Sequence, residues 1–278
     1  MKRIGILRGG DAEYYNTSLK KGGEVILHLH ENLADKYKPV DILIDREYMW
    51  YVNGLPINPS ELVNKIDIAW NFSHPSVSNI LESLAIPHIR NVSLFGNGQH
   101  QGRELLREHM KKIGVPMPRQ VISPKNAQEV FEKFGSPWIV KIYNEVKIAK
   151  TFPELAEMIN EKVGVIVEEF IPGKIASVHS VPAFRGQDVY VFPVGDVFSN
   201  FSREEKERLV SLAKSLHAHI EARHYLKSDF VLNPRGRVYL LNIESHPDIK
   251  PGSHFHQVCE SVGAKVHQVI DHLLERVK

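Results

Sequence analysis

Cysteine is nearly absent from this sequence, which contains only Cys259 among its 278 residues. One thiol cannot form an intramolecular disulfide, and without a second cysteine no thiolate pair is available to bind a metal. The chain also lacks any run of about 18 apolar residues, the length that could cross a bilayer. Its basic start is followed by an apolar stretch that Gly5 interrupts and Arg8 ends, which predicts a buried strand rather than a signal peptide. These absences predict a cytoplasmic protein without a membrane partner.

Charge of one sign is not in excess either. The 35 Lys and Arg residues stand against 33 Asp and Glu residues, and the basic side chains are scattered instead of forming runs. Such a distribution gives no electrostatic footprint for nucleic acid, so a nucleic-acid-binding protein is disfavoured. A small anionic substrate suits this balance better. The hydrophobic content of 42% is that of an ordinary globular protein.

The order of apolar patterns predicts the fold class. Short apolar runs alternate with helical patterns from the first residue, which is typical of an α/β chain with largely parallel strands. A βα order near the start favours a doubly wound N-terminal domain over residues 1–95. A central module is expected over 96–172 and a C-terminal module over 173–278. An antiparallel hairpin predicted over 175–197 gives the last module a sheet of mixed direction.

Three oxygen-bearing side chains follow one another on two strands predicted near the end of the chain. Asp229 starts one strand, and Asn242 and Glu244 end the next. Residues i and i+2 of a strand point to the same face, so the three side chains can converge. Mg²⁺ prefers oxygen ligands and usually takes one or two carboxylates together with nucleotide phosphates. The pattern favours a metal site; the alternative is a surface hairpin whose polar residues face solvent.

The same segment resembles the last domain of the D-alanine–D-alanine ligases, which belong to the ATP-grasp family. Those enzymes carry an Asp on one strand, a Glu-x-Asn pair on the next, and then a Pro and a Ser-bearing loop. In this chain Asn242 and Glu244 stand in exchanged order. Ser253 matches the Ser that holds the substrate carboxylate, and Lys227 falls where the family has an oxyanion-stabilising Arg. The resemblance implies a metal at Asp229, Asn242 and Glu244, with Lys227 and Ser253 as catalytic residues.

A second resemblance concerns the strand and hinge that cover the adenine base. The segment 165–173 is similar to this part of the ligases. The resemblance implies that Glu168 accepts a hydrogen bond from the adenine amino group and that backbone groups from Glu169 to Ile171 contact the base. Phe170 and Ile171 would give apolar cover. The alternative is a buried strand that ends in a Pro-Gly turn.

Cations for the phosphates are implied at two further positions. Lys141 matches the strand lysine that reaches the α- and β-phosphates of ATP, and Arg107 lies where the ligases carry a second phosphate-binding cation. The alternative for Lys141 is an ammonium group that extends to solvent. In the first domain, Glu13 is similar to the family's substrate-amine Glu.

Several loops of the family are shortened or changed. No glycine occurs between Ile142 and Val163, where the ligases have a Gly- and Ser-rich loop over the phosphates. Such loops bind phosphate through free backbone N–H groups. Ile175 replaces the family's ribose-binding Glu. These departures predict that MgATP binds more readily than the chain ligates amino acids.

The sequence contains fifteen histidines, which raises the alternative that histidines bind a metal. His217 and His219 lie two apart on a predicted helix, so their side chains diverge by about 200° and cannot bind one metal. His246, His254 and His256 are close in sequence, but surface or capping roles are favoured over a zinc site. Cys259 is interpreted as a small helical residue that packs in the hydrophobic core.

Taken with the residues above, the resemblance implies an ATP-grasp fold preceded by a doubly wound N-terminal domain, and an ATP- and Mg²⁺-dependent carboxylate–amine ligase. The carboxylate would be phosphorylated by ATP, and an amine would then attack the acyl phosphate. The substrate would be an amino acid or dipeptide of peptidoglycan biosynthesis, and the protein a cytoplasmic homodimer. The alternative is an impaired homologue that binds nucleotide or a partner without ligating.

Overall fold

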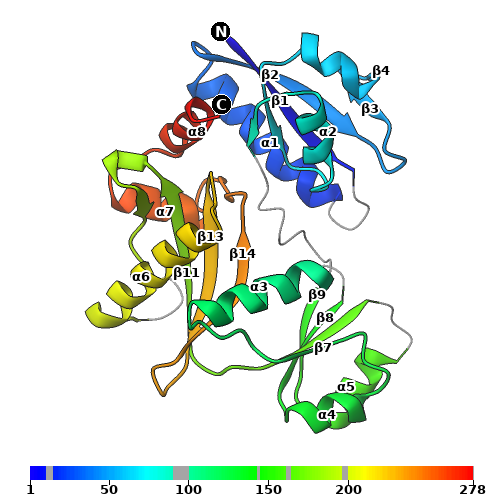
Figure 1. The fold of residues 1–278 in the computed structure, drawn as a ribbon, viewed down its shortest axis with the longest axis vertical. Coiled ribbons are helices and arrows are strands. Elements are labelled where there is room, and N and C mark those ends of the chain that lie inside the picture. Colours follow the sequence, from blue (N-terminus) through cyan, green and yellow to red (C-terminus); the bar gives the residue numbers. More distant parts are fainter. Residues whose placement is uncertain (11–14, 90–99, 143–144, 161–163, 196–199, 278) are drawn as a thin grey trace.

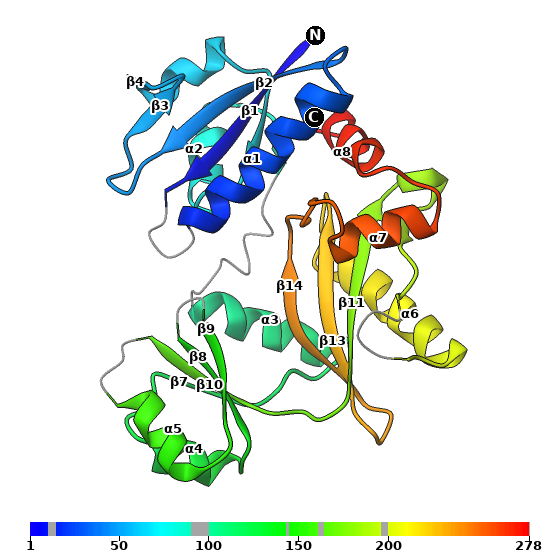
Figure 2. The ribbon, with the colours of Figure 1, turned by 180° about the vertical axis from the view of Figure 1, so that it is seen from behind.

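The computed structural model describes residues 1–10, 15–89, 100–142, 145–160, 164–195 and 200–277. It contains three sheets that follow one another along the chain (Figure 1, and from behind in Figure 2). Helices and strands alternate along the chain, which confirms the predicted α/β class. Among the described strands, however, parallel pairs occur in the first sheet alone, so the expectation of largely parallel strands throughout is wrong. No helix in the described ranges is long and apolar enough to cross a membrane.

The first sheet is doubly wound, as predicted. Its strand order is β4-β3-β2-β1-β5-β6, and β2, β1, β5 and β6 run parallel. One face of β1 packs Ile4 and Ile6 against α1, whereas Leu7 on the other face belongs to the cluster that contains Leu81 of α2. The elements are β1 (Lys2–Gly9), α1 (Tyr15–Asn32), β2 (Tyr37–Ile44), β3 (Trp50–Val52), β4 (Leu55–Ile57), a 3-10 helix (Pro59–Asn64), β5 (Ile68–Asn71), α2 (Val77–Ser83) and β6 (His88–Ile89).

The second sheet is antiparallel, in the order β7-β10-β8-β9. Alternate residues of β8, including Trp138 and Val140, share a core with residues of α4 and α5, while Ile139 and Lys141 project from the opposite face. Strand β9 occupies a segment for which the sequence pattern predicted no element. The elements are α3 (His100–Lys112), β7 (Gln120–Ile122), α4 (Ala127–Lys133), β8 (Trp138–Ile142), β9 (Glu145–Ala149), α5 (Phe152–Ile159) and β10 (Val165–Glu169).

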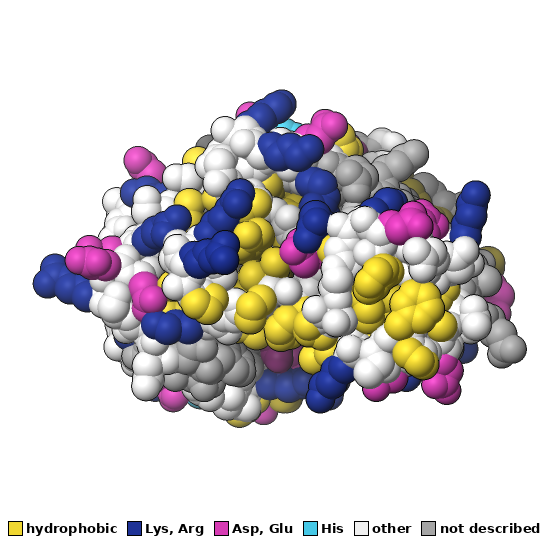
Figure 3. Space-filling model, turned by 90° about the horizontal axis from the view of Figure 1, so that it is seen from below, with side chains coloured by type: hydrophobic (Ala, Val, Ile, Leu, Met, Phe, Trp, Pro, Cys, Tyr) yellow, Lys and Arg dark blue, Asp and Glu magenta, His cyan; other side chains and the backbone are white. Residues whose placement is uncertain are grey.

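The outer surface of this second unit is partly apolar. Phe131 of α4 and Phe152 of α5 are 52% and 42% exposed, and their rings meet edge to face at 6.1 Å. Seen from below, hydrophobic side chains gather on the side of α4 and α5 and in the middle of the molecule, bordered by Lys and Arg side chains (Figure 3). Phe131 is therefore an aromatic residue whose burial is incomplete.

The third sheet has the order β12-β11-β13-β14, and all its described strand pairs are antiparallel, so the predicted sheet of mixed direction is wrong. Helix α6 covers one face and α7 lies on the other side (Figures 1 and 2). A Cβ atom at Gly173 would lie 2.2 Å from the carbonyl oxygen of Leu232, so only glycine fits just before β11. The elements are β11 (Lys174–Pro182), a 3-10 helix (Phe184–Gly186), β12 (Val189–Val191), α6 (Arg203–His219), β13 (Leu226–Leu232), β14 (Val238–Glu244), α7 (His254–Ser261) and α8 (Val266–Glu275).

One hydrophobic cluster joins the first sheet to the third. Ile6 and Leu29 of the first unit share it with Phe255 and Cys259 of α7. Cys259 is buried, as predicted for a helical residue that packs in the hydrophobic core. Helix α8 adds an ion pair from Asp271 to Lys36 at 2.6 Å. The first and third sheets are therefore tied together by a continuous core.

Burial of His217 on α6 makes stability depend on pH. This side chain is 2% exposed, and burial lowers its pKa to about 4. In the unfolded chain a histidine binds its proton near pH 6.5, so between pH 4 and 6.5 the unfolded state holds more protons and the free energy of unfolding falls as the pH falls. Ser180 Oγ lies 2.8 Å from His217 Nδ1, and a glutamine at this position can keep that hydrogen bond. When the pH falls from 7 to 5, we expect the free energy of unfolding of His217→Gln to decrease by about 2 kcal/mol less than that of wild type.

Urea unfolding at the two pH values measures this difference. His30→Gln, at an exposed position of α1, is the matched control and should lose as much stability as wild type. Equal losses in wild type and His217→Gln would contradict the assignment of the pH effect to His217.

Candidate active site on the third sheet

One face of the third sheet is polar. Lys227 and Asp229 of β13 stand opposite Glu244 and Asn242 of β14, and opposite His179 and Ser177 of β11. Directly paired residues of neighbouring strands share a face, so these six side chains lie together. The alternate residues of β11 and β13, including Val178 and Phe230, pack in the core with α6. The sheet is thus apolar towards α6 and polar on its other face.

Lys227 lies between two carboxylates on this face. Its Nζ is 3.1 Å from Asp229 Oδ2 and 3.3 Å from Glu244 Oε1. Ser177 donates a hydrogen bond of 2.6 Å to Asp229 Oδ1. Burial by itself would lower the pKa of Lys227, but the carboxylates of Asp229 and Glu244 outweigh it and raise that pKa. The ammonium group is therefore charged at neutral pH, next to the predicted metal ligands.

A lysine from the first unit completes this arrangement. Lys21 of α1 places its Nζ 3.3 Å from Glu244 Oε2. Burial alone would raise the pKa of Glu244, but Lys21 and Lys227 together lower it. Lys21 could not be predicted from the sequence, because nothing in the pattern of α1 shows that this helix meets β14. The structure adds Lys21 to the candidate site.

The oxygen donors fit an open magnesium site. Asp229 and Asn242 face each other across β13 and β14, and Glu244 is two residues further along the same face. The described part of the chain contains no group of three or more His, Cys, Asp or Glu residues arranged for a metal. Two carboxylates and one amide suit a hard cation that takes its other ligands from phosphate and water, and they do not form a closed zinc-type site. The polar face can supply part of a magnesium coordination shell.

The second sheet places Lys141 and Glu168 on the face opposite α4 and α5. Lys141 of β8 forms an ion pair of 2.7 Å with Glu168 of β10, which is 5% exposed. Val146 of β9 stands directly opposite Lys141 and Ile148 opposite Ile139. Val146 and Ile148 are 64% and 48% exposed. This face therefore offers apolar surface beside a cation.

The other residues predicted to bind the base or the phosphates contact different parts of the chain. Glu169 is held by Arg119 at 2.8 and 2.9 Å, and this contact lowers its pKa. Phe170 and Ile171 are half-buried and lie between the end of β10 and the start of β11. Arg107 donates to the carbonyl oxygen of Pro118 at 2.7 Å. The hinge segment connects the two sheets on which the candidate residues lie.

Ser253 is the N-cap of α7. It accepts a bond of 3.1 Å from the backbone N–H of His256 and donates one of 2.7 Å to the carbonyl oxygen of Asp248. Glu13 lies outside the described residues. His254 follows Ser253 and contacts His179 of β11 at 2.7 Å, while His256 pairs with Glu260 at 3.4 Å. His254 is thus bonded to a buried ring beside the polar face, a contact that neither a surface nor a capping role describes.

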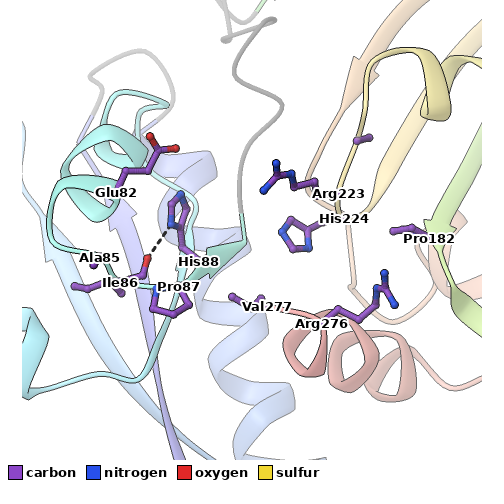
Figure 4. A pocket seen from close by; sticks show the side chains of 11 residues that line it. Glu82, Ala85, Ile86, Pro87, His88, Pro182, Arg223, His224, Arg276 and Val277 are labelled. Carbon is purple, nitrogen blue, oxygen red and sulfur yellow. Dashed lines mark hydrogen bonds between the residues drawn. The ribbon is translucent and has the colours of Figure 1, made fainter.

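A separate cavity of about 790 Å³ opens between the first and third units. Figure 4 shows Glu82 and His88 on one wall, and Arg223 and His224 on the other. None of the residues of the polar face lines this cavity. Cavity size therefore does not locate the candidate site, which is recognised by its side-chain chemistry.

Comparison with known proteins connects this geometry to a family. The family described as the D-ala D-ala ligase C-terminus matches residues 196–275, which contain Lys227, Asp229, Asn242, Glu244 and Ser253. D-alanine–D-alanine ligase B of Clostridium perfringens is 22% identical over 98% of this chain and 97% of its own length. D-alanyl-alanine synthetase A of Vibrio cholerae superposes with a TM-score of 0.79 at 17% identity, over 99% of this chain and 98% of that one.

The chain thus resembles the D-alanine–D-alanine ligases and has their ATP-grasp fold. A further solved structure of the same fold is the D-alanine–D-alanine ligase of Bacillus anthracis in complex with ATP, with a TM-score of 0.74 and 21% identity over 99% of this chain and 96% of that one. The match extends over the whole chain, so the first, doubly wound unit belongs to the shared fold as well. In this ATP-grasp fold the polar face of the third sheet carries Lys227, Asp229, Asn242 and Glu244, and the face of the second sheet opposite α4 and α5 carries Lys141 and Glu168.

Proposed function

We propose that this protein is an ATP- and Mg²⁺-dependent carboxylate–amine ligase that joins two amino acids, with D-alanine as the first candidate substrate. The observation that carries the proposal is the polar face, where Lys227 lies within 3.3 Å of both Asp229 and Glu244 in a fold shared with ATP-dependent ligases. Names of the relatives support the substrate class. The product would enter peptidoglycan biosynthesis in the cytoplasm, and the protein would act as a homodimer.

The residues divide the chemistry between them. Lys141 and Arg107 bind the phosphates of ATP, and Glu168 to Ile171 hold the base. The γ-phosphoryl group passes to a carboxylate oxygen of the first amino acid, ADP leaves, and the amine of the second attacks the carbonyl carbon with release of phosphate. Mg²⁺, held by Asp229, Asn242 and Glu244, would neutralise phosphate charge.

Lys227 stabilises negative charge that develops on the carbonyl oxygen, because a preorganised cation acts strongly where water is excluded. Ser253 holds the carboxylate of the second amino acid, and Glu13 binds the amine of the first. The proposed domains are residues 1–95, 96–172 and 173–278, with ATP between the last two.

Binding of MgATP tests the nucleotide part of the proposal. A ligand bound only by the native state at a hundred times its Kd stabilises it by about 2.7 kcal/mol, which raises Tm by about 5 °C in a chain of this size. We expect this increase for wild type and less than half of it for Lys141→Ala. Each increase is measured from the variant's own ligand-free Tm, because Lys141→Ala also removes the ion pair with Glu168.

Lys147→Ala on β9, which removes an exposed lysine of the same sheet, is the control and should shift like wild type. A wild-type melting curve that does not move in millimolar MgATP would contradict nucleotide binding. Stabilisation by MgATP without phosphate release, over a panel of D- and L-amino acids, would instead support the impaired homologue.

A further inference from the structure

Three side chains, of which His179 lies on the polar face, form a hydrogen-bonded row that the proposed reaction does not use. The hydroxyl of Tyr225 lies 2.5 Å from His179 Nδ1, and His179 Nε2 lies 2.7 Å from His254 Nδ1. Tyr225 and His179 are 1% and 2% exposed, and both rings pack against Phe255. The Tyr225–His179 pair, buried and closely packed, therefore has little freedom to rearrange, whereas His254 is half-buried.

The direction of these hydrogen bonds follows from the protons available. Burial, with His254 and Lys227 nearby, lowers the pKa of His179 well below its usual value, so its ring is neutral and carries one N–H. Burial also raises the pKa of Tyr225, which therefore keeps its hydroxyl proton. If Tyr225 donates to His179 Nδ1, the proton of His179 is on Nε2 and is donated to His254 Nδ1.

The reverse direction is unfavourable. It would have His179 donate from Nδ1 to Tyr225, and the Tyr225 hydroxyl proton would then have no acceptor among the described residues. A buried donor without an acceptor is costly. The favoured direction leaves Nδ1 of His254 as an acceptor, so a neutral His254 carries its own proton on Nε2.

The position of His254 connects this tautomer to the site. His254 is the first residue of α7 and follows Ser253. Its ring lies close enough to Lys227 and Asp229 for both to affect its pKa, which burial lowers. His179 stands directly opposite Lys227 on the polar face. A neutral N–H donor at this place suits a carboxylate better than it suits a metal.

We propose that Tyr225 and His179 are positioning residues that hold His254 in its Nε2–H tautomer, in which it donates a hydrogen bond to the carboxylate of the second amino acid. This inference rests on the proposed ligase function, because the carboxylate is the one assigned to Ser253. His254 would add a hydrogen-bond donor to the site. Without it, Lys227 and Ser253 alone would have to orient the second amino acid, whose amine is the nucleophile.

The tautomers are measured without turnover. Long-range ¹H–¹⁵N spectra of ligand-free protein with labelled histidine distinguish Nε2–H from Nδ1–H rings, and the signals are assigned from His179→Gln and His254→Gln. We expect Nε2–H for both rings in wild type and a mixture for His179 in Tyr225→Phe. An Nδ1–H form of His254 in wild type would overturn the proposal.

Kinetics test the role in binding. In an active wild type, His254→Leu and His179→Leu should each raise KM for the second amino acid by about tenfold, the loss expected for one hydrogen bond to a charged group, and leave KM for ATP unchanged. His179→Gln keeps a donor and an acceptor and should restore part of the affinity. His267→Leu, a half-buried histidine of α8, is the control.

Failure of the ligase proposal and failure of the histidine inference give different results. A wild type without amino-acid-dependent turnover contradicts the ligase proposal, and the spectra still decide the tautomers. Equal rises in both KM values, with His179→Gln no better than His179→Leu, would show that the row is only structural and would overturn the inference.

Discussion

Asp229→Asn is expected to lower amino-acid-dependent phosphate release from MgATP at least about a hundredfold, the loss typical when one preorganised electrostatic group is removed from a transition state. The change keeps the shape of the side chain and removes its charge. The proposed cation loses one of its two carboxylate ligands. Lys227, which is 3.1 Å from Asp229, keeps only the carboxylate of Glu244. A coupled phosphate assay at saturating ATP measures the loss.

Asp188→Asn is the matched control, because this exposed aspartate lies just before β12 of the same sheet and away from the polar face. It should keep wild-type activity. Glu244→Gln should raise the Mg²⁺ concentration needed for half of the stabilisation by ATP. Full activity and an unchanged Mg²⁺ requirement in Asp229→Asn would show that the polar face is a hairpin surface and not the metal site.

Phe255→Ala is expected to lower the free energy of unfolding by about 3–5 kcal/mol, as for other large aromatic residues removed from a core. Phe255 is 1% exposed, and its ring lies 5.1 to 5.5 Å from those of His179, Tyr225 and Phe192. It belongs to the cluster that joins the first and third sheets. The cavity left by the ring would weaken both the packing of α7 and this connection.

Phe131→Ala on α4 is the control, since that ring is 52% exposed. It should cost less than about 1.5 kcal/mol, because only part of its area is removed from water. Guanidinium unfolding followed by both fluorescence and circular dichroism checks whether the transition has a single step. Equal losses in the two variants would mean that Phe255 is not central to the core.

The sequence alone was sufficient for the local parts of the site. Side chains alternate along a strand because of backbone geometry, so Asp229, Asn242 and Glu244 were predictable as one polar face once two adjacent strands were recognised. The doubly wound order of the first unit followed from its alternating βα pattern. The short edge hairpin β3–β4 and strand β9 were not predicted, because three to five residues carry too little periodicity.

Other contacts were decided only by the tertiary structure. Lys21 and Glu244 are 223 residues apart in the chain, and His179 and His254 are 75 apart. Likewise, Glu168 became the partner of Lys141 only when β10 paired with β8. Periodicity determines which face of an element a residue occupies, but it carries no information about which other element will cover that face. The sequence by itself therefore determined the polar face of the third sheet. The packing of α1 and α7 decided that Lys21 and the His179–His254 pair lie beside it. Those contacts depend on how whole units pack around a shared core.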